Sequence, residues 1–97
     1  MAKIQWSRTS YLELAAYLDY VTAERGDAAA QATRIAGAIQ TLRSFPEAAP
    51  RFHGAVRRLV VTGLSLSIYY ALEQDTVCIL HVRHDKQKPQ DLVKRGP

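Results

Sequence analysis

Cysteine is nearly absent from this sequence, which has Cys78 alone among its 97 residues. A single thiol excludes an intramolecular disulfide, and its place inside an apolar run favours a small buried core residue. No apolar stretch approaches the roughly 20 residues that cross a bilayer, and the segment MAKIQWS lacks the apolar core of a signal peptide. We therefore expect a cytoplasmic protein that does not enter a membrane.

Motifs for metal ions and cofactors are also lacking. The three histidines, His53, His81 and His84, form no paired-histidine helix motif and have no carboxylate at ligand spacing. His81 alternates with Val77 and Ile79, which favours a half-buried, hydrogen-bonded sheet residue. No glycine-rich phosphate-binding loop occurs. We expect neither a metal site nor a cofactor.

Acidic residues are scarce in the second half of the chain, where the whole net charge of +4 resides. Residues 1–50 carry five basic and five acidic side chains, whereas residues 51–97 carry eight basic and four acidic ones. A local basic excess favours anionic partners such as nucleic acid, an acidic protein segment or a membrane surface. The excess is small for a dedicated nucleic-acid binder.

Length and composition predict one folded domain over residues 1–97. An apolar fraction of 47% with 23% charged residues is typical of a globular protein, and this length is near the usual size of one domain. Residues 86–97 are expected to be a frayed terminus or a docking tail, since Leu92 and Val93 could pack as one helical turn.

Two helices are predicted in the first half. After a short strand, KIQW, Ser7 stands where the N-cap of a helix belongs. Gly26 suits a left-handed C-cap, and Asp27 can cap a second helix at once, so we expect an antiparallel hairpin. Glu13 lies off the predicted buried face of the first helix. That face consists of residues at helical spacing, namely Tyr11, Leu14, Ala15, Leu18 and Val21.

Three strands are predicted in the second half. The segment FPEAAPRFHG, with two prolines and a glycine, is expected to be a loop. VRRLVV, LSLSIYYAL and TVCILHV follow it as strands separated by short turns. The order β-α-α-β-β-β predicts an α+β fold, in which a helical hairpin packs on one face of a small, mainly antiparallel twisted sheet.

This order of elements, together with several residues, resembles the ParE/RelE superfamily of toxins from bacterial type II toxin–antitoxin modules. The resemblance covers residues 4–89. Its most specific elements are RLVV beginning at Arg58, Tyr70 in the next strand, Asp75 in an acidic turn, and ILHVRH ending at His84. The resemblance implies a toxin that a cognate ParD-like antitoxin neutralises in a hetero-oligomer.

The superfamily implies two different activities. RelE-like toxins cut messenger RNA on the ribosome, with an arginine in a strand ending YRxxY and a tyrosine or histidine near the C-terminus. Aligning Tyr70 with the final tyrosine puts Ser67 where the arginine would be, and no tyrosine follows Arg83. The ending HVRHDKQKP resembles the ParE-type ending. We therefore expect an inhibitor of DNA gyrase without catalytic residues of its own.

Two alternatives stay open. An endoribonuclease of the same fold would use His84 as acid or base, with Arg58 and Arg83 stabilising the extra charge of the phosphorane. A degenerate module would bind an antitoxin-like partner and harm nothing. Direct binding of nucleic acid is left open as well.

Basic and aromatic strand residues make the predicted surface for the target and the antitoxin. Tyr69 shares a strand face with Ser65 and Ser67, too polar for a core and too uncharged for a solvated surface, so we expect another chain to lie there. An acidic antitoxin tail that folds on the toxin would pair its carboxylates with the cations. The expected binding residues are Arg51, Arg58, Tyr69, Arg83, His84, Lys86 and Lys88.

Overall fold

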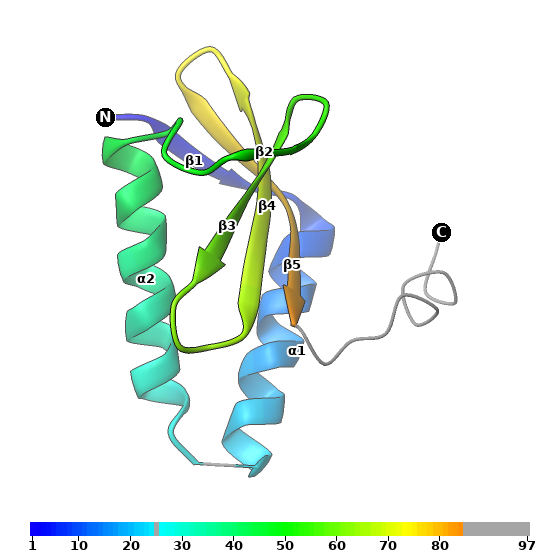
Figure 1. Cartoon of the computed structure of the whole chain (residues 1–97). Helices are drawn as coiled ribbons and strands as arrows, with labels where there is room; N and C mark the ends of the chain where they lie inside the picture. Colours follow the sequence, from blue (N-terminus) through cyan, green and yellow to red (C-terminus); the bar gives the residue numbers. More distant parts are fainter. Residues whose placement is uncertain (25, 85–97) are drawn as a thin grey trace.

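The computed structural model describes residues 1–24 and 26–84 and has the predicted α+β fold (Figure 1). Its elements are β1 (Lys3–Trp6), α1 (Arg8–Glu24), α2 (Ala28–Ser44), β2 (Arg51–His53), β3 (Val56–Val61), β4 (Leu66–Glu73) and β5 (Thr76–His84). The helical hairpin and the three later strands are confirmed. The predicted loop is wrong in part because it contains β2. The predicted tail lies outside the described residues.

The five strands form one sheet in the order β1-β5-β4-β3-β2. Strands β2 to β5 pair antiparallel, while β1 pairs parallel to β5. The register of β4 and β5 shifts between Tyr69, which faces His81, and Tyr70, which faces Ile79. Leu80 is therefore an extra residue in a bulge, and side chains of β5 change face at this point.

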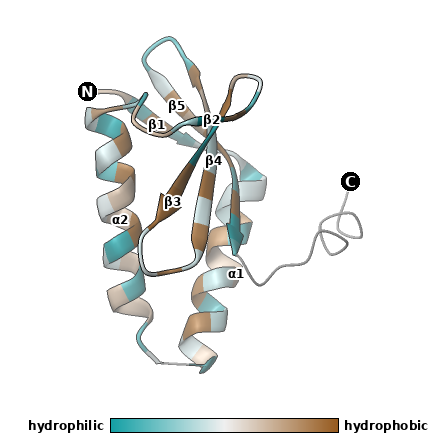
Figure 2. Ribbon diagram, viewed as in Figure 1, coloured by the Kyte–Doolittle hydropathy of each residue, from teal (hydrophilic) through white to brown (hydrophobic). Residues whose placement is uncertain are grey.

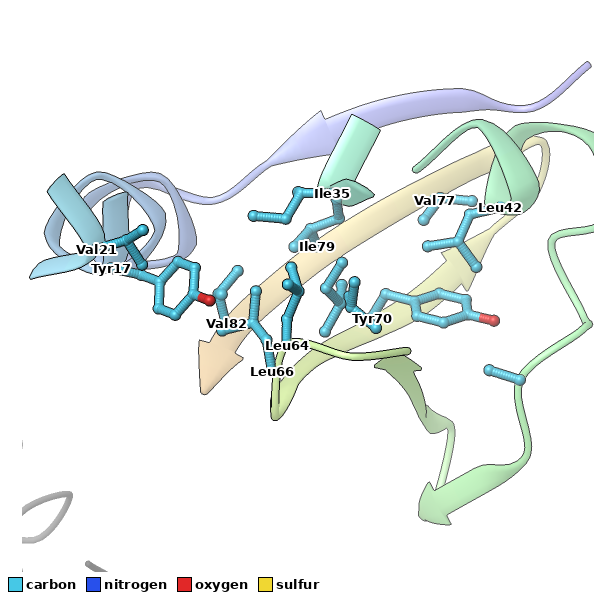
Figure 3. Packing of buried hydrophobic residues seen from close by; sticks show 13 residues of the cluster. Tyr17, Val21, Ile35, Leu42, Leu64, Leu66, Tyr70, Val77, Ile79 and Val82 are labelled. Atoms are coloured by element: carbon cyan, nitrogen blue, oxygen red, sulfur yellow. The ribbon is translucent and has the colours of Figure 1, made fainter. Parts of the chain in front are cut away.

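The helices cover one face of the sheet, which we call the inner face. Leu66, Ile68 and Tyr70 alternate along β4 and are fully buried on this face, as the period of two predicts. Figure 3 shows side chains from both helices and from β4 and β5 pointing into one cluster. Burying each large apolar side chain contributes roughly 1.5–3 kcal/mol, so this cluster is the main stabilising feature of the fold.

Helix α1 begins as predicted, and its predicted buried face is right at Leu14, Leu18 and Val21 but wrong at Tyr11 and Ala15, which are exposed. The N–H of Ser10 donates to Ser7 Oγ over 3.0 Å, which is the expected N-cap. Tyr11, predicted to be buried, is 63% exposed, whereas Tyr17 lies in the core. Glu13, predicted to lie off the buried face, points toward β5. The first turns of the face were misjudged because Ser10 and Glu13 contact the backbone of β5 there, and no apolar side chain marks that contact.

The connection between the helices follows the prediction at one residue and departs from it at the next. Gly26 has φ of +73°, the left-handed conformation expected of a C-cap. Asp27 precedes α2 but its side chain makes no cap bond. Its carboxylate instead accepts from Nε2 of Gln31 over 3.3 Å, so an i, i+4 side-chain pair replaces the expected cap.

Strand β2 carries no apolar pattern because its three residues are all exposed. It is held by pairing of Arg51 with Arg57 and of His53 with Val56. The N–H of Arg58 also donates to the Pro50 carbonyl over 3.1 Å, and proline keeps this acceptor although it lacks a donor. Backbone pairing therefore makes a strand where composition predicted a loop.

Cys78 is not in the core, contrary to the prediction. It is half-buried and free, and its neighbours in the ladder are Ala71 and Gln5 on the face away from the helices. Partial burial raises the pKa of its thiol, and the Glu73 carboxylate raises that pKa further. Among the residues that the structure describes, no helix is long and apolar enough to cross a membrane.

Candidate macromolecule-binding surface

The face of the sheet away from the helices, the outer face, has a patch of aromatic and basic side chains. In the ladder Tyr69 lies between Arg58 and His81, and Ser67 lies between Val60 and Arg83. Figure 2 shows hydrophobic and hydrophilic segments alternating along β4 and a hydrophilic end of β5. We define the outer-face patch as Phe52, Arg58, Val60, Ser67, Tyr69, His81 and Arg83.

An aromatic pair forms one side of the outer-face patch. The rings of Phe52 and Tyr69 meet edge to face, with centroids 5.1 Å apart and an interplanar angle of 70°. This is a favourable geometry for aromatic rings. Phe52 nevertheless leaves 57% of its surface exposed. An exposed ring held in place by its neighbour loses little conformational entropy when a partner covers it.

Arg58 is held across the strands on the same face. Its Nε donates to Ser67 Oγ over 3.1 Å, and Ser67 is buried. The serine, which occupies the place of the expected catalytic arginine, therefore positions a neighbouring arginine. A guanidinium fixed by one hydrogen bond is a preorganised partner for a carboxylate or a phosphate.

Glu13 of α1 holds the other end of the outer-face patch. Its carboxylate accepts from Nη1 of Arg83 and, over 3.0 Å, from the backbone N–H of Val82. The side chains of Glu13 and Arg83 are only 11% and 21% exposed. Much of the Arg83 charge is therefore already balanced inside the chain, which makes this arginine a weaker attractor for a partner than the sequence suggested.

His81 joins this group on the outer face. Its Nδ1 lies 3.4 Å from Oε1 of Glu13 and 3.1 Å from Nη2 of Arg83. His81 is the half-buried, hydrogen-bonded sheet residue that the sequence predicts. It does not share the face of Ile79, because the bulge at Leu80 turns the later residues of β5 over. The side chain is 44% exposed, so the imidazole can meet a ligand.

Several predicted binding residues do not gather with this group. His84 faces Leu66 in the ladder, and its ring contacts those of Tyr17 and Tyr20 at 5.4 and 5.8 Å. It therefore lies on the inner face, away from Arg58. Arg51 faces Arg57, whose guanidinium bonds carbonyls behind the sheet, so it also lies away from the outer-face patch. Lys86 and Lys88 lie outside the described residues.

Glu13, Phe52 and His81 were missed as members of the site. The contacts of Glu13 join residues about 70 positions apart, and no local pattern reports such a contact. A signal was present in the spacing of Ser7, Ser10 and Glu13, which places three polar side chains on one helical stripe. Phe52 was overlooked because β2 was not predicted.

The chemistry of the outer-face patch favours binding. Two arginines and an aromatic pair suit an anionic or planar group. Within residues 1–24 and 26–84, no three His, Cys, Asp or Glu side chains gather closely enough to hold a metal ion.

No protein-family model matches this sequence, and no curated protein matches it either. Among solved structures, a chain of the chromosomal ParDE TA system from P. aeruginosa is similar, with a TM-score of 0.76 at 20% identity. The match covers 87% of this chain and 96% of that chain. The two chains share one fold. At this identity the likeness concerns the fold, so the function of this chain is argued from its own residues.

Proposed function

We propose that this chain is a cytoplasmic toxin of a type II toxin–antitoxin module, which inhibits DNA gyrase by binding and is neutralised by a cognate antitoxin. The likeness in fold to a chain of a ParDE TA system supports the module. The outer-face patch supports the binding mode. A gyrase–DNA complex offers both carboxylates and phosphates, the two groups that a fixed arginine recognises best.

The arrangement of Arg58 beside the Phe52–Tyr69 pair is the observation that carries this proposal. Ser67 holds Arg58 and Tyr69 holds Phe52, so a cation and an exposed ring both lie next to Tyr69. Aromatic and arginine side chains dominate the energy of protein interfaces. Arg58 and the aromatic pair can bind a partner without any proton transfer, as expected of an inhibitor that acts by binding.

Positive charge on both faces of the half of the sheet that contains β2, β3 and β4 supports an acidic partner, with Arg58 on the outer face and Arg57 on the inner one. Residues 48–72 contain Arg51, Arg57 and Arg58 but no aspartate or glutamate. An antitoxin tail rich in carboxylates would gain by covering this half of the sheet, and occupancy of the outer-face patch would exclude gyrase.

A supercoiling assay tests the proposal directly. Purified chain is added to gyrase and relaxed plasmid, and supercoiled product or trapped cleaved DNA is followed on gels. We expect loss of supercoiling in proportion to added chain. Gyrase that works normally at large excess of the chain overturns the proposed target, and unimpaired growth on expression overturns toxicity itself.

RNA cleavage is the second candidate, and the position of His81 favours it. This imidazole lies beside a carboxylate and an arginine on the outer face, whereas the predicted catalytic histidine, His84, lies on the other face. A ribonuclease built here would use His81 as the base and Arg58 and Arg83 as the stabilising cations. Incubation with translating ribosomes should then cut the message, and His81→Gln should abolish cutting while His53→Gln leaves it intact.

A further inference from the structure

One edge of the sheet is left open along β3. Strand β2 pairs only with Val56 and Arg57, and the last bond on that side joins the Arg58 N–H to the Pro50 carbonyl. Past Arg58, no strand among the described residues lies beside β3 on this side. An open edge offers backbone donors and acceptors to another chain.

Val60 presents the backbone groups of this open edge. In an antiparallel ladder, successive residues direct their N–H and C=O alternately toward one neighbour and the other. Because the Arg58 N–H points away from β4, the backbone groups of Val60 point away from β4 as well. The Val60 side chain is 56% exposed.

A groove of about 300 Å³ runs between this edge and α2. Gly37 and Ala38 of α2 and Leu59 of β3 line it, and a Cβ added to Gly37 would meet no atom within 4 Å. The groove therefore has room for side chains of an added strand above an apolar floor. Arg34 also lines the groove, and its Nη1 donates to the Thr62 carbonyl over 3.3 Å.

We propose that an extended, acidic segment of the partner adds to β3 as a further strand at Val60, with alternate side chains in the groove beside Gly37. The partner is the antitoxin, so this inference rests on the proposed function. The acid-free stretch of residues 48–72 and Arg34 at the groove supply the matching charge. Side chains on the other face of the added strand would lie beside Val60 and reach Arg58.

Hydrogen exchange of individual amides tests this strand addition. The isotope-labelled chain is studied by NMR with a capped peptide of alternating valine and glutamate as the probe. We expect the Val60 amide, fast in the free chain, to slow by about tenfold or more on binding, while the Leu59 and Val61 amides, which point toward β4, change little. An unchanged Val60 amide overturns the inference, as does equal binding of the peptide with lysine in place of glutamate.

Two variants of the chain sharpen the test. Val60→Pro removes the outward N–H without touching the bonds between β3 and β4, and proline is tolerated on edge strands. Gly37→Leu fills the groove from the helix side. Each variant should raise the dissociation constant of the peptide about tenfold, which is equivalent to about 1.4 kcal/mol of binding free energy. Gly37→Ala is the matched control for the groove and should bind almost normally, because its added Cβ meets no atom within 4 Å.

The outcomes separate this inference from the proposed function. If Val60→Pro does not fold, as judged by circular dichroism, Gly37→Leu decides the matter alone. Protection of Val60 that grows with the concentration of the chain, without peptide, would instead assign the edge to a second copy. Gyrase inhibition is measured separately. If the chain does not inhibit gyrase, the proposed function is wrong, but strand addition at Val60 can still be correct.

Discussion

Strands β5 and β3 are each paired along only part of one edge, and the chain treats the unpaired parts differently. β1 pairs with β5 only as far as Ile79, and β2 pairs with β3 only as far as Arg57. On the β5 side, α1 continues the protection: the Ser7 N–H and the Ser10 hydroxyl donate to the Ile79 carbonyl, and the Ser7 hydroxyl donates to the Leu80 carbonyl. Glu13 then accepts from the Val82 N–H.

The β3 side has no such cover among the described residues. Its groove is floored by small side chains, and Arg34 reaches the Thr62 carbonyl at one end. The difference shows that side chains of a helix can bond the unpaired backbone groups of one edge strand while another edge strand keeps its backbone groups open. The edge that stays open is beside the most basic part of the sheet.

Glu13→Ala should have the largest effect, because it breaks the sealed edge. The Val82 N–H and the Arg83 guanidinium both lose their acceptor at a site that is nearly buried, which should cost about 3 kcal/mol of unfolding free energy. Urea denaturation measures this loss. Glu13→Gln keeps one acceptor oxygen and should lose less; equal stability of all three proteins would contradict the sealing role.

Ser10→Ala removes one link of the same seal. Ser10 is fully buried and its hydroxyl donates to the Ile79 carbonyl over 3.1 Å. We expect a loss of about 1 kcal/mol, the net value of one hydrogen bond, because the Ile79 carbonyl keeps the Ser7 N–H as a donor. The exposed neighbour serves as the control, since Thr9→Ala should stay within about 0.5 kcal/mol of the wild type. A neutral Ser10→Ala would mean that water replaces the hydroxyl.

Tyr70→Phe removes a hydrogen bond near the side of the sheet where the edge of β3 is open. The Tyr70 hydroxyl donates to the Pro46 carbonyl over 2.8 Å and so fixes the connection that leads to β2; losing this bond should cost about 1 kcal/mol. Burial raises the pKa of Tyr70, so the folded chain keeps its proton at a pH where the unfolded chain loses it. The stabilisation is complete below pH of about 10 and is lost as pH rises through the folded pKa.

Stability measured from neutral to strongly alkaline pH checks this expectation. The wild type should lose stability faster than Tyr70→Phe above pH of about 10, since phenylalanine cannot ionise. Subtracting the two curves cancels the other tyrosines. Parallel curves would show that Tyr70 does not carry the alkaline dependence.

Val60→Ala should have the smallest effect on the chain alone. The Val60 side chain is mostly exposed. We therefore expect the free energy of unfolding, measured by urea denaturation, to change by no more than about 0.5 kcal/mol. A loss comparable to that of Ser10→Ala would mean that the open edge is part of the folding core, and the contrast between the edges would disappear.

Much of the fold could be predicted because its signals are local. The alternation of Leu66, Ile68 and Tyr70 gave the inner face of β4, and Ser7 gave the start of α1. What failed depends on distant backbone. Strand β2 exists through pairing with β3, and the bulge at Leu80 exists through the register of β4 and β5, which no single segment encodes.

The residues of the candidate site also fall into those that a local pattern predicts and those that depend on distant parts of the chain. Arg58 and Tyr69 could be placed on one strand face by alternation alone, and the ladder has them as neighbours. His84 could not be placed, because the bulge reverses the faces after Leu80. Glu13 could not be found, because its partners lie about 70 residues away along the chain.

The most direct test of the account is gyrase supercoiling with variants of the outer-face patch. Wild-type chain should inhibit, while Arg58→Ala and Tyr69→Ala should each need about tenfold more chain for the same inhibition, as expected for interface residues that carry most of the binding energy. Arg8→Ala, an exposed cation of α1, should inhibit like the wild type. Equal inhibition by all four proteins would contradict a role for the outer-face patch.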